Sequence, residues 1–291
     1  MKPAGAVDVI QLFDEERALL LTVLDALSAD EWLAPTVCAS WSVKDIAAHV
    51  VGDDLGAASG GDGWSAGFID ATDFGELVAA INAQNEAWVA SMRRLSPRLI
   101  VEMLRFSGEH AFTSYRARDL DAVGQPVDWA GPGPAPVWLH IAREYTERWL
   151  HSQQIYDAIA ALREGAHPAP ASLERRLMHP VLDTFARSLP RAYQDTEAPE
   201  GTHVRLVVKG EAGCSWSLVR GVDPQSTQKT QRWALMDDVR TKAAATVTID
   251  QDAAWRMYTK GLPPDAVRSR ASIEGDVALG AVALSAVAIL A

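Results

Sequence analysis

The sequence of 291 residues is poor in cysteine, and its two cysteines are Cys38 and Cys214. They lie far apart, in segments that we assign below to different domains, which argues against a disulfide framework. Basic residues are also in the minority: 27 lysines and arginines face 38 aspartates and glutamates, giving a formal net charge of −11 and a pI near 5.1. Because this charge repels polyanions, we expect neither nucleic acid nor an anionic membrane as a partner and favour a small molecule.

Long apolar segments are missing as well. The first amphipathic stretch carries Asp8, Asp14, Glu15 and Glu16. It therefore lacks the apolar core of a signal peptide, and we expect a cytoplasmic protein. The most apolar run, residues 277–291, is shorter than the roughly 20 residues that a membrane-spanning helix needs. We predict that this run forms a buried C-terminal helix.

Core-forming side chains are plentiful, because 48% of the residues are hydrophobic and the length is sufficient for two domains. From residue 7 to about residue 160 the apolar residues recur at helical spacing, and no alternating strand pattern is evident. The segments that interrupt this spacing are 33–40, 56–67, 96–97 and 129–138. The pattern predicts an up-and-down four-helix bundle over residues 1–162, with one extra helix near 97–119.

The second half of the sequence has a different pattern. A segment rich in proline and alanine at 163–172 is followed by a helical stretch at 172–188. Alternation at strand period then appears in 202–210, 214–220 and 245–250. A short helix, a further strand at 270–276 and the terminal apolar helix follow. We predict an α+β domain over residues 172–291, in which helices cover a small antiparallel sheet.

His49 stands in an otherwise apolar helix that begins after Ser42. Ser42 and Asp45 have the spacing of a capping box, which fixes the start of this helix. The helix then places Asp45, His49 and Asp53 on one face, because residues four apart lie one turn from each other. A single histidine on such a face is most often a core residue with a hydrogen-bond partner, so His49 alone does not establish a metal site.

A second segment, residues 138–159, carries four ligand-type side chains on one helical stripe, namely His140, Glu144, Glu147 and His151. Charged residues at this spacing usually form a solvated face. Here the neighbouring stripe is apolar, which favours a helix packed inside the bundle. Glu147 and His151, at i and i+4, can chelate one ion, and His49 on another helix can supply the third ligand.

The helix start W-S-V-K-D-I-A-A-H, followed much later by E-R-W-L-H, resembles the DinB-type metal-binding four-helix bundles, in particular the mycothiol-dependent, maleylpyruvate isomerase-like group. The second half, with VTIDQDAAWRMYTKG running into ASIEGD and an apolar helix, is similar to the sterol-carrier-like domain that follows the bundle in that group. The resemblance covers most of the chain. It departs from the group's pattern in H-S-Q-Q-I-Y-D after the second histidine and in a long insertion at 97–136.

The resemblance implies Zn²⁺, or another divalent metal such as Fe²⁺ or Ni²⁺, at His49, Glu147 and His151. It also implies mycothiol or a similar thiol as cosubstrate. Two imidazoles and one carboxylate leave zinc with an open coordination position, where a thiol would be deprotonated at neutral pH. We therefore predict an isomerase or an S-transferase that acts on a small electrophile, and the sequence does not choose between them.

Two other hypotheses stay open at this point. The same three side chains suit non-haem iron, which would allow oxygen chemistry. Alternatively, the chain is a non-catalytic protein whose second domain binds a lipid or another small molecule while the bundle serves as a scaffold. The sequence indicates no oligomeric state.

Further residues are candidates for catalytic or binding roles. Asp53, His140 and Glu144 lie one or two turns from the expected ligands and are candidates for holding the ligands or orienting the substrate. Arg256 and Lys260 share one face of a short helix and are candidates for binding an anionic substrate or cofactor, although a solvated face explains them more simply. Cys38 is not expected to be a nucleophile, since free cysteines are commonly small core residues.

Overall fold

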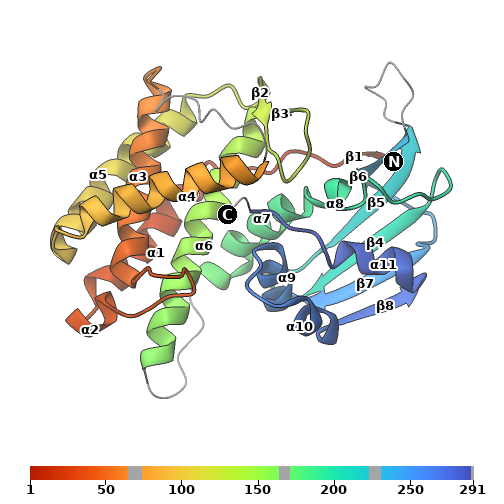
Figure 1. Ribbon diagram of the computed structural model, residues 1–291. Helices are drawn as coiled ribbons and strands as arrows, with labels where there is room; N and C mark the ends of the chain where they lie inside the picture. The colour runs from red at the N-terminus through yellow and green to blue at the C-terminus, as the bar shows by residue number, and fades with distance from the viewer. Residues whose placement is uncertain (65–73, 164–170, 223–230, 290–291) are drawn as a thin grey trace. The chain divides into compact units, whose positions relative to one another are not determined.

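The computed structural model describes residues 1–64, 74–163, 171–222 and 231–289 (Figure 1). The chain divides into two compact units. The helical unit comprises Asp8–Leu120 and Arg143–Leu173, and the sheet unit comprises Met1–Val7, Asp121–Ala142 and the chain from Glu174 onward. A helix-rich first part and a sheet-containing second part confirm the predicted fold class. The predicted boundary between 1–162 and 172–291 falls largely outside the described residues and stays a prediction.

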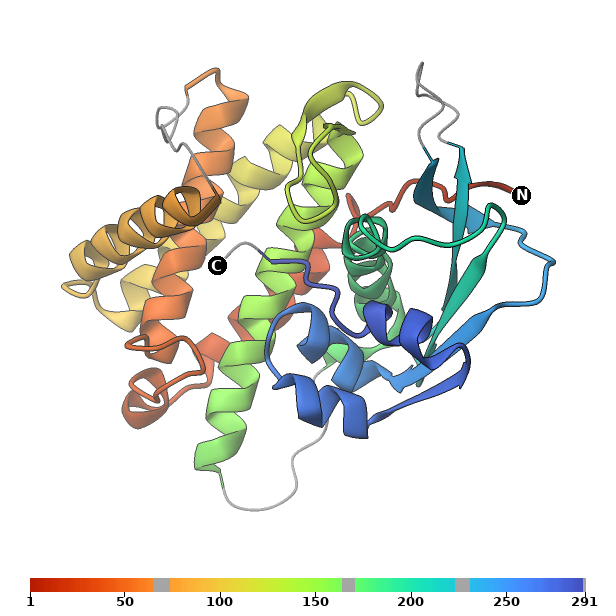
Figure 2. The same ribbon diagram turned by 45° about the vertical axis from the view of Figure 1, so that its right-hand side comes forward.

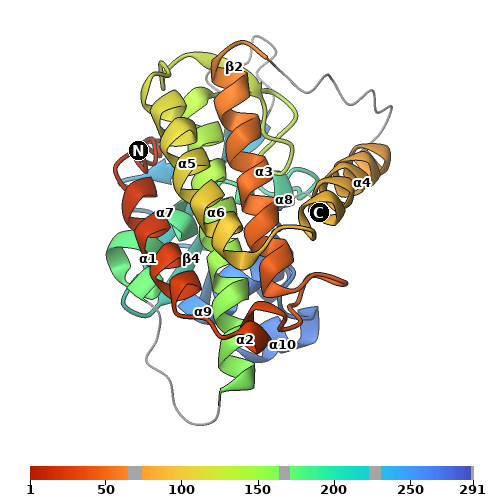
Figure 3. The same cartoon turned by 90° about the vertical axis from the view of Figure 1, so that its left-hand side faces the viewer.

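The helices of the first part are α1 (Phe13–Asp25), α2 (Ala29–Trp32), α3 (Val43–Gly61), α4 (Phe74–Met92), α5 (Pro97–Arg116) and α6 (Val137–Leu162). Helices α1, α3, α5 and α6 run side by side, whereas α4 crosses beside α3 at an angle (Figure 3), where Trp88 of α4 donates to the carbonyl of Ala48 at 2.8 Å. The helix expected as the extra one, near 97–119, is therefore a bundle member, and α4 is the additional helix. The reason is burial. Helix α5 buries residues along its length, whereas in α4, among the residues whose burial is described, Val89 and Met92 near its end are the buried ones.

Apolar side chains from all four bundle helices meet in one core. Its buried members include Leu20 and Leu24 of α1, Ile46 and Val50 of α3, Ile100 and Leu104 of α5, and Ile155 and Ile159 of α6. These positions follow the three- and four-residue spacing of amphipathic helices, so the sequence pattern and the packing agree. Among the described residues, no helix has both the length and the apolarity needed to cross a membrane.

A buried ionic cluster joins the same four helices. Asp54 of α3 accepts hydrogen bonds from Arg17 of α1 at 2.8 Å, from Arg148 of α6 at 2.9 Å and from Ser107 of α5 at 2.9 Å. Burial raises the pKa of Asp54, but the charges of Arg148 and Arg17 outweigh it and hold the pKa below its usual value. The carboxylate is therefore ionised in the core, where each of its oxygens is satisfied.

The sheet unit contains a six-stranded sheet with the strand order β1-β6-β5-β4-β7-β8. Its strands are β1 (Lys2–Pro3), β4 (His203–Lys209), β5 (Ser215–Val222), β6 (Gln231–Asp237), β7 (Ala245–Asp250) and β8 (Ala271–Gly275). Neighbours are antiparallel except β4 and β7, which pair in parallel from Val204 opposite Ala245 to Lys209 opposite Asp250.

The expectation of a purely antiparallel sheet is therefore wrong. Strands β4, β5 and β6 form a meander, so β6 ends at the same end of the sheet as β4. The chain from 238 to 244 returns to the opposite end before β7 begins, and this return makes β7 parallel to β4. Strand periodicity identifies strands but carries no information on the direction of pairing.

Helices cover one face of this sheet (Figures 1 and 2). They are α7 (Arg175–Ala186), α8 (Leu189–Ala192), α9 (Gln251–Tyr258), α10 (Pro264–Ser269) and α11 (Val277–Ala283). The covered face carries the buried residues Val204, Leu206 and Val208 of β4 and Ala245, Val247 and Ile249 of β7. Alternate residues of both strands thus form the core, as expected for a sheet with one covered face.

Two local predictions are wrong. A hairpin of β2 (Val123–Pro126) and β3 (Pro134–Pro136) lies where no strand was expected, because these short, proline-containing strands show no alternation of apolar and polar residues. The predicted helix over 277–291 ends at Ala283, and residues 286–289 have no regular secondary structure. Ala286 and Ala288 are nevertheless buried, so the apolar run reflects burial rather than a long helix.

The capping box at the start of α3 is confirmed and generates a prediction about stability. The Ser42 hydroxyl accepts from the Asp45 amide at 3.3 Å, and the Asp45 carboxylate accepts from the Ser42 amide at 3.0 Å. Ser42→Ala should lower the free energy of unfolding by about 1 kcal/mol, because an amide of the first turn loses its acceptor. Urea denaturation measures this loss. Thr22→Ala, at an exposed position inside α1, is the control, and an equal loss in both variants would contradict the capping role.

Candidate metal centre

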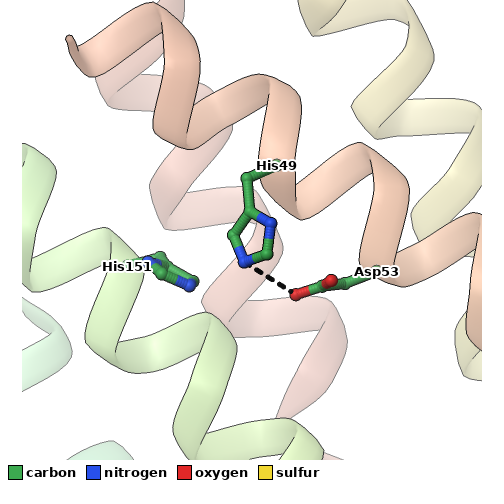
Figure 4. A group of neighbouring side chains, drawn as sticks. All are labelled: His49, Asp53 and His151. Carbon is green, nitrogen blue, oxygen red and sulfur yellow. Dashed lines mark ion pairs between the residues drawn. The ribbon is translucent and has the colours of Figure 1, made fainter. Parts of the chain in front are cut away.

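Three ligand-type side chains from two helices meet inside the helical unit. His49 and Asp53 come from α3 and His151 comes from α6, and one ligand atom of each lies within 4.8 Å of the others (Figure 4). The imidazole rings of His49 and His151 are 4.7 Å apart between centroids and nearly perpendicular, at 85°. Nε2 of His49 lies 3.2 Å from Oδ2 of Asp53. This arrangement offers two nitrogens and one carboxylate oxygen, a common donor set for a divalent transition metal.

Local sequence explains how these side chains come together. His49 and Asp53 are four residues apart on α3, so they project from one face on consecutive turns. The capping box at Ser42 fixes where this helix begins. The side chain of Trp41 packs beside His49, with 5.1 Å between the ring centroids. Both histidines are buried in the bundle, with exposed fractions of 6% for His49 and 8% for His151.

Burial determines the charge states of this cluster in the metal-free protein. It lowers the pKa of His49 and the pKa of His151, and the neighbouring His49 lowers that of His151 further. Neutral imidazoles are the form that binds metals. Burial raises the pKa of Asp53 to about 7, against an opposing effect of the nearby Arg148 charge. A bound cation would favour the ionised form of this carboxylate.

Glu147, the predicted carboxylate ligand, is half-buried one turn before His151 on α6. It is not part of the group of three whose ligand atoms lie within 4.8 Å. Its charge nevertheless raises the pKa of His49, His151 and Asp53, so it lies within electrostatic reach of all three. The structure thus brings together the two predicted histidine ligands and adds Asp53, and ligation by Glu147 stays a prediction.

Glu144 is engaged in an ionic network. Its carboxylate accepts from Arg143 at 2.6 Å, from Arg148 at 2.9 Å and from the hydroxyl of Tyr115 at 3.0 Å. Burial alone would raise the pKa of Glu144, but the charges of Arg143 and Arg148 lower it to about 2. Glu144 is therefore a permanent anion that holds Arg148. A catalytic role for it stays a prediction.

The remaining candidates belong to the sheet unit. Nε2 of His140 lies 2.7 Å from the carbonyl oxygen of Gln125 in β2, which ties His140 to the hairpin. Arg256 pairs with Asp252 at 2.9 Å and stacks its guanidinium on the ring of Trp255, 4.2 Å from the centroid. Lys260 is exposed just beyond the end of α9. Roles of His140, Arg256 and Lys260 toward a substrate or cofactor stay predictions.

Sequence reasoning did not assign a site role to Gln154. Its Oε1 lies 2.8 Å from Nδ1 of His151 and accepts from the thiol of Cys38 at 3.4 Å. Gln154 lies three residues after His151, within one helical turn, so its position was a usable signal. The contact with Cys38 was not readable, because it joins residues 116 positions apart.

Comparison with known proteins finds a matching family model for the helical part of the chain. Residues 13–156 match the family model described as the mycothiol maleylpyruvate isomerase N-terminal domain. No curated protein matches. Two solved structures are similar, a mycothiol-dependent maleylpyruvate isomerase and its mutant with one histidine replaced by alanine. Each is 12% identical, with a TM-score of 0.48 and coverage of 85% of this chain and 86% of the other.

The raised pKa of Asp53 predicts a pH-dependent stability of the metal-free protein. Its pKa is about 7 in the folded chain, against an ordinary value of 3.8. Between these values the folded state binds more protons than the unfolded state, so this group's contribution to stability is lost as the pH rises. Asp53→Asn removes that loss. Relative to the wild type, the variant should gain stability between about pH 5 and about pH 8 in urea denaturation.

The control for this measurement is Asp128→Asn, which changes an exposed aspartate. Its stability difference from the wild type should be the same at both pH values. If Asp53→Asn also showed a difference that did not change with pH, the carboxyl would not be titrating in this window.

Proposed function

We propose that this chain, whose residues 13–156 match the family model of the mycothiol maleylpyruvate isomerase N-terminal domain, is a metal- and thiol-dependent enzyme acting on a small electrophile. The observation that supports this most directly is the cluster of His49, Asp53 and His151 in the bundle interior. Buried groups with pKa values shifted by their surroundings, gathered in one place, are typical of functional sites.

The side chains of the cluster fit a divalent metal. Both histidines favour the neutral form that ligates, and a carboxylate lies beside them. We propose Zn²⁺ held by His49 and His151, with Asp53 or Glu147 as the carboxylate ligand. Zinc bound by three protein side chains lowers the pKa of a thiol or water in its open position, and so supplies a nucleophile at neutral pH.

The nucleophile in this proposal is an external low-molecular-weight thiol of the mycothiol type. Cys38 belongs to the same unit as the cluster, but burial raises the pKa of its thiol, and the charge of Glu147 raises it further. A cysteine with a raised pKa holds little thiolate at neutral pH and is a poor nucleophile. Cys214 is exposed and belongs to the sheet unit. The chain's own thiols therefore fit the chemistry poorly.

Two reactions use such a thiolate. Addition to a cis double bond conjugated to a carbonyl forms a carbon–sulfur bond and leaves a carbon–carbon single bond that can rotate. Expulsion of the same thiolate then restores the double bond as trans. Displacement of a leaving group by the thiolate instead gives a thioether and releases that group, which is S-transfer. We propose cis–trans isomerisation first, because the family model that matches residues 13–156 is named for an isomerase.

A second candidate function rests on the donor set. Two histidines and one aspartate also suit non-haem iron with open coordination positions, and iron would permit oxygen chemistry. The third hypothesis, a lipid-binding second domain, calls for an apolar tunnel. The sheet unit has a hollow of about 200 Å³ whose lining includes Arg205, Asp237, Ser215 and Ser217. These polar groups suit a lipid chain poorly, so the hollow gives that hypothesis no support.

Metal binding tests the first part of this proposal. We expect about one zinc ion per chain after purification without added metal, and a loss of most of it in His49→Ala and His151→Ala. Asp53→Asn and Glu147→Gln compare the two carboxylates, and the larger loss identifies the ligand. His110→Ala, at an exposed position on α5, is the matched control. Wild-type zinc content in all four variants, His49→Ala, His151→Ala, Asp53→Asn and Glu147→Gln, would place the metal elsewhere.

Turnover tests the second part. With zinc bound and maleylpyruvate as the first electrophile to try, activity should require an added low-molecular-weight thiol. It should survive the double change Cys38→Ala and Cys214→Ala. Activity should fall at acid pH, as protonation of His49 and His151 releases the ion. Full turnover without a thiol, or turnover only with iron and oxygen, would replace this proposal with the non-haem iron enzyme.

A further inference from the structure

Gln154 lies between His151 of the candidate metal site and the loop that precedes α3. It lies on α6, three residues after His151, and is half-buried. Its side-chain oxygen Oε1 is 2.8 Å from Nδ1 of His151 and 3.4 Å from Sγ of Cys38. One amide oxygen therefore meets two groups that can donate a proton, from two separate parts of the helical unit.

An amide oxygen is only an acceptor, which settles the protonation of the His151 ring. Because Oε1 accepts at Nδ1, that nitrogen carries the hydrogen of the neutral imidazole. Nε2 then keeps its lone pair free. Figure 4 shows one ring nitrogen of His151 directed toward His49 and Asp53 and the other toward its own helix. The nitrogen left free by Gln154 is thus the one that faces the cluster.

The geometry points to Gln154 as a positioning residue that fixes His151 in the tautomer and ring orientation needed to bind the metal through Nε2. This inference rests on the proposed metal site and names the support of one of its ligands. Histidine ligands commonly donate their second ring nitrogen to a carbonyl or carboxylate oxygen, and loss of such a partner typically weakens metal binding 10- to 100-fold.

The loop residue Cys38 has a secondary part in this arrangement. Its thiol donates to the same Oε1, and its backbone amide donates to the hydroxyl of Thr36 at 3.2 Å. The Thr36 hydroxyl in turn donates to the carbonyl of Trp41 at 2.8 Å, just before α3. Cys38 therefore holds the Gln154 amide oxygen from the loop side. This contact orients the amide without requiring Cys38 to bind the metal.

The experiment measures the affinity of the full chain for Zn²⁺ by competition with a chromophoric chelator. Gln154→Leu removes the acceptor while keeping a side chain of similar size, and we expect affinity to fall 10- to 100-fold. Gln154→Glu keeps an acceptor oxygen at the same reach and should stay within a few-fold of the wild type. Cys38→Ala should also lose far less than Gln154→Leu.

The neighbouring residue provides a matched control. Gln153 is buried on the same helix and donates to the hydroxyl of Ser172 at 2.7 Å. Gln153→Leu should lower the stability of the helical unit while leaving zinc affinity unchanged. Equal loss of affinity in Gln153→Leu and Gln154→Leu would mean that general damage to α6 explains the effect and would overturn the inference. A larger loss in Cys38→Ala would make Cys38 a ligand and overturn it as well.

A second readout does not depend on metal. In the metal-free wild type, nitrogen-15 NMR of the imidazole of His151 should show the hydrogen on Nδ1, and in Gln154→Leu it should show a mixture of both tautomers. If the wild type bound no divalent metal, the proposed function would fail while this measurement still decided the role of Gln154. If Gln154→Leu kept wild-type zinc affinity and the Nδ1 tautomer, the inference alone would be wrong.

Discussion

The carboxylate of Asp54 is the constraint on which the helical unit depends. It lies on α3 and accepts hydrogen bonds from Arg17 of α1, Ser107 of α5 and Arg148 of α6. One side chain therefore connects four helices. A buried charge that loses its partner typically costs 3–5 kcal/mol. Any rotation or sliding of one helix against the others would break these bonds. The ionic cluster therefore selects one packing among those that the apolar core alone would tolerate.

The contacts of Asp54 also position the candidate metal site, because Asp54 and Arg148 are close in sequence to the ligand-type residues of that site. Asp53 precedes Asp54 on α3, and His151 follows Arg148 by three residues on α6. Once Asp54 and Arg148 are joined, the relative depth and rotation of α3 and α6 are set. His49, Asp53 and His151 then have to meet. The ion pair between Asp54 and Arg148 thus aligns the two helices beside the three ligand-type side chains.

Much of this arrangement was predictable from local patterns, and the rest depends on tertiary contacts. The capping box at Ser42 and the helical stripes follow from spacing within one helix, whereas the pairing of His49 with His151 joins two helices and was expected from the resemblance to a known family. The parallel pairing of β4 and β7 and the membership of α5 in the bundle do not follow from such spacing, because direction and partner choice are decided between elements. The contact between Cys38 and Gln154 was also not predictable, because it joins two distant segments of the chain. From the sequence, Asp53 was expected to hold the ligands or orient the substrate. Only the structure shows that its carboxylate oxygen lies beside the nitrogens of His49 and His151.

Among the carboxylates of Asp53, Asp54 and Glu144, that of Asp53 is the one whose negative charge the neighbouring arginines do not balance. Arg148 donates from Nε to Asp54 and from Nη1 to Glu144, and its charge lowers the pKa values of both carboxylates. The charge of Arg148 lowers the pKa of Asp53, but the effect of burial is larger and raises this pKa to about 7. The arginines therefore stabilise the two structural carboxylates and do not fully stabilise this one. A divalent ion held by His49 and His151 would supply the missing positive charge, because it favours the ionised carboxylate and needs neutral imidazoles, the form that burial already favours for both histidines.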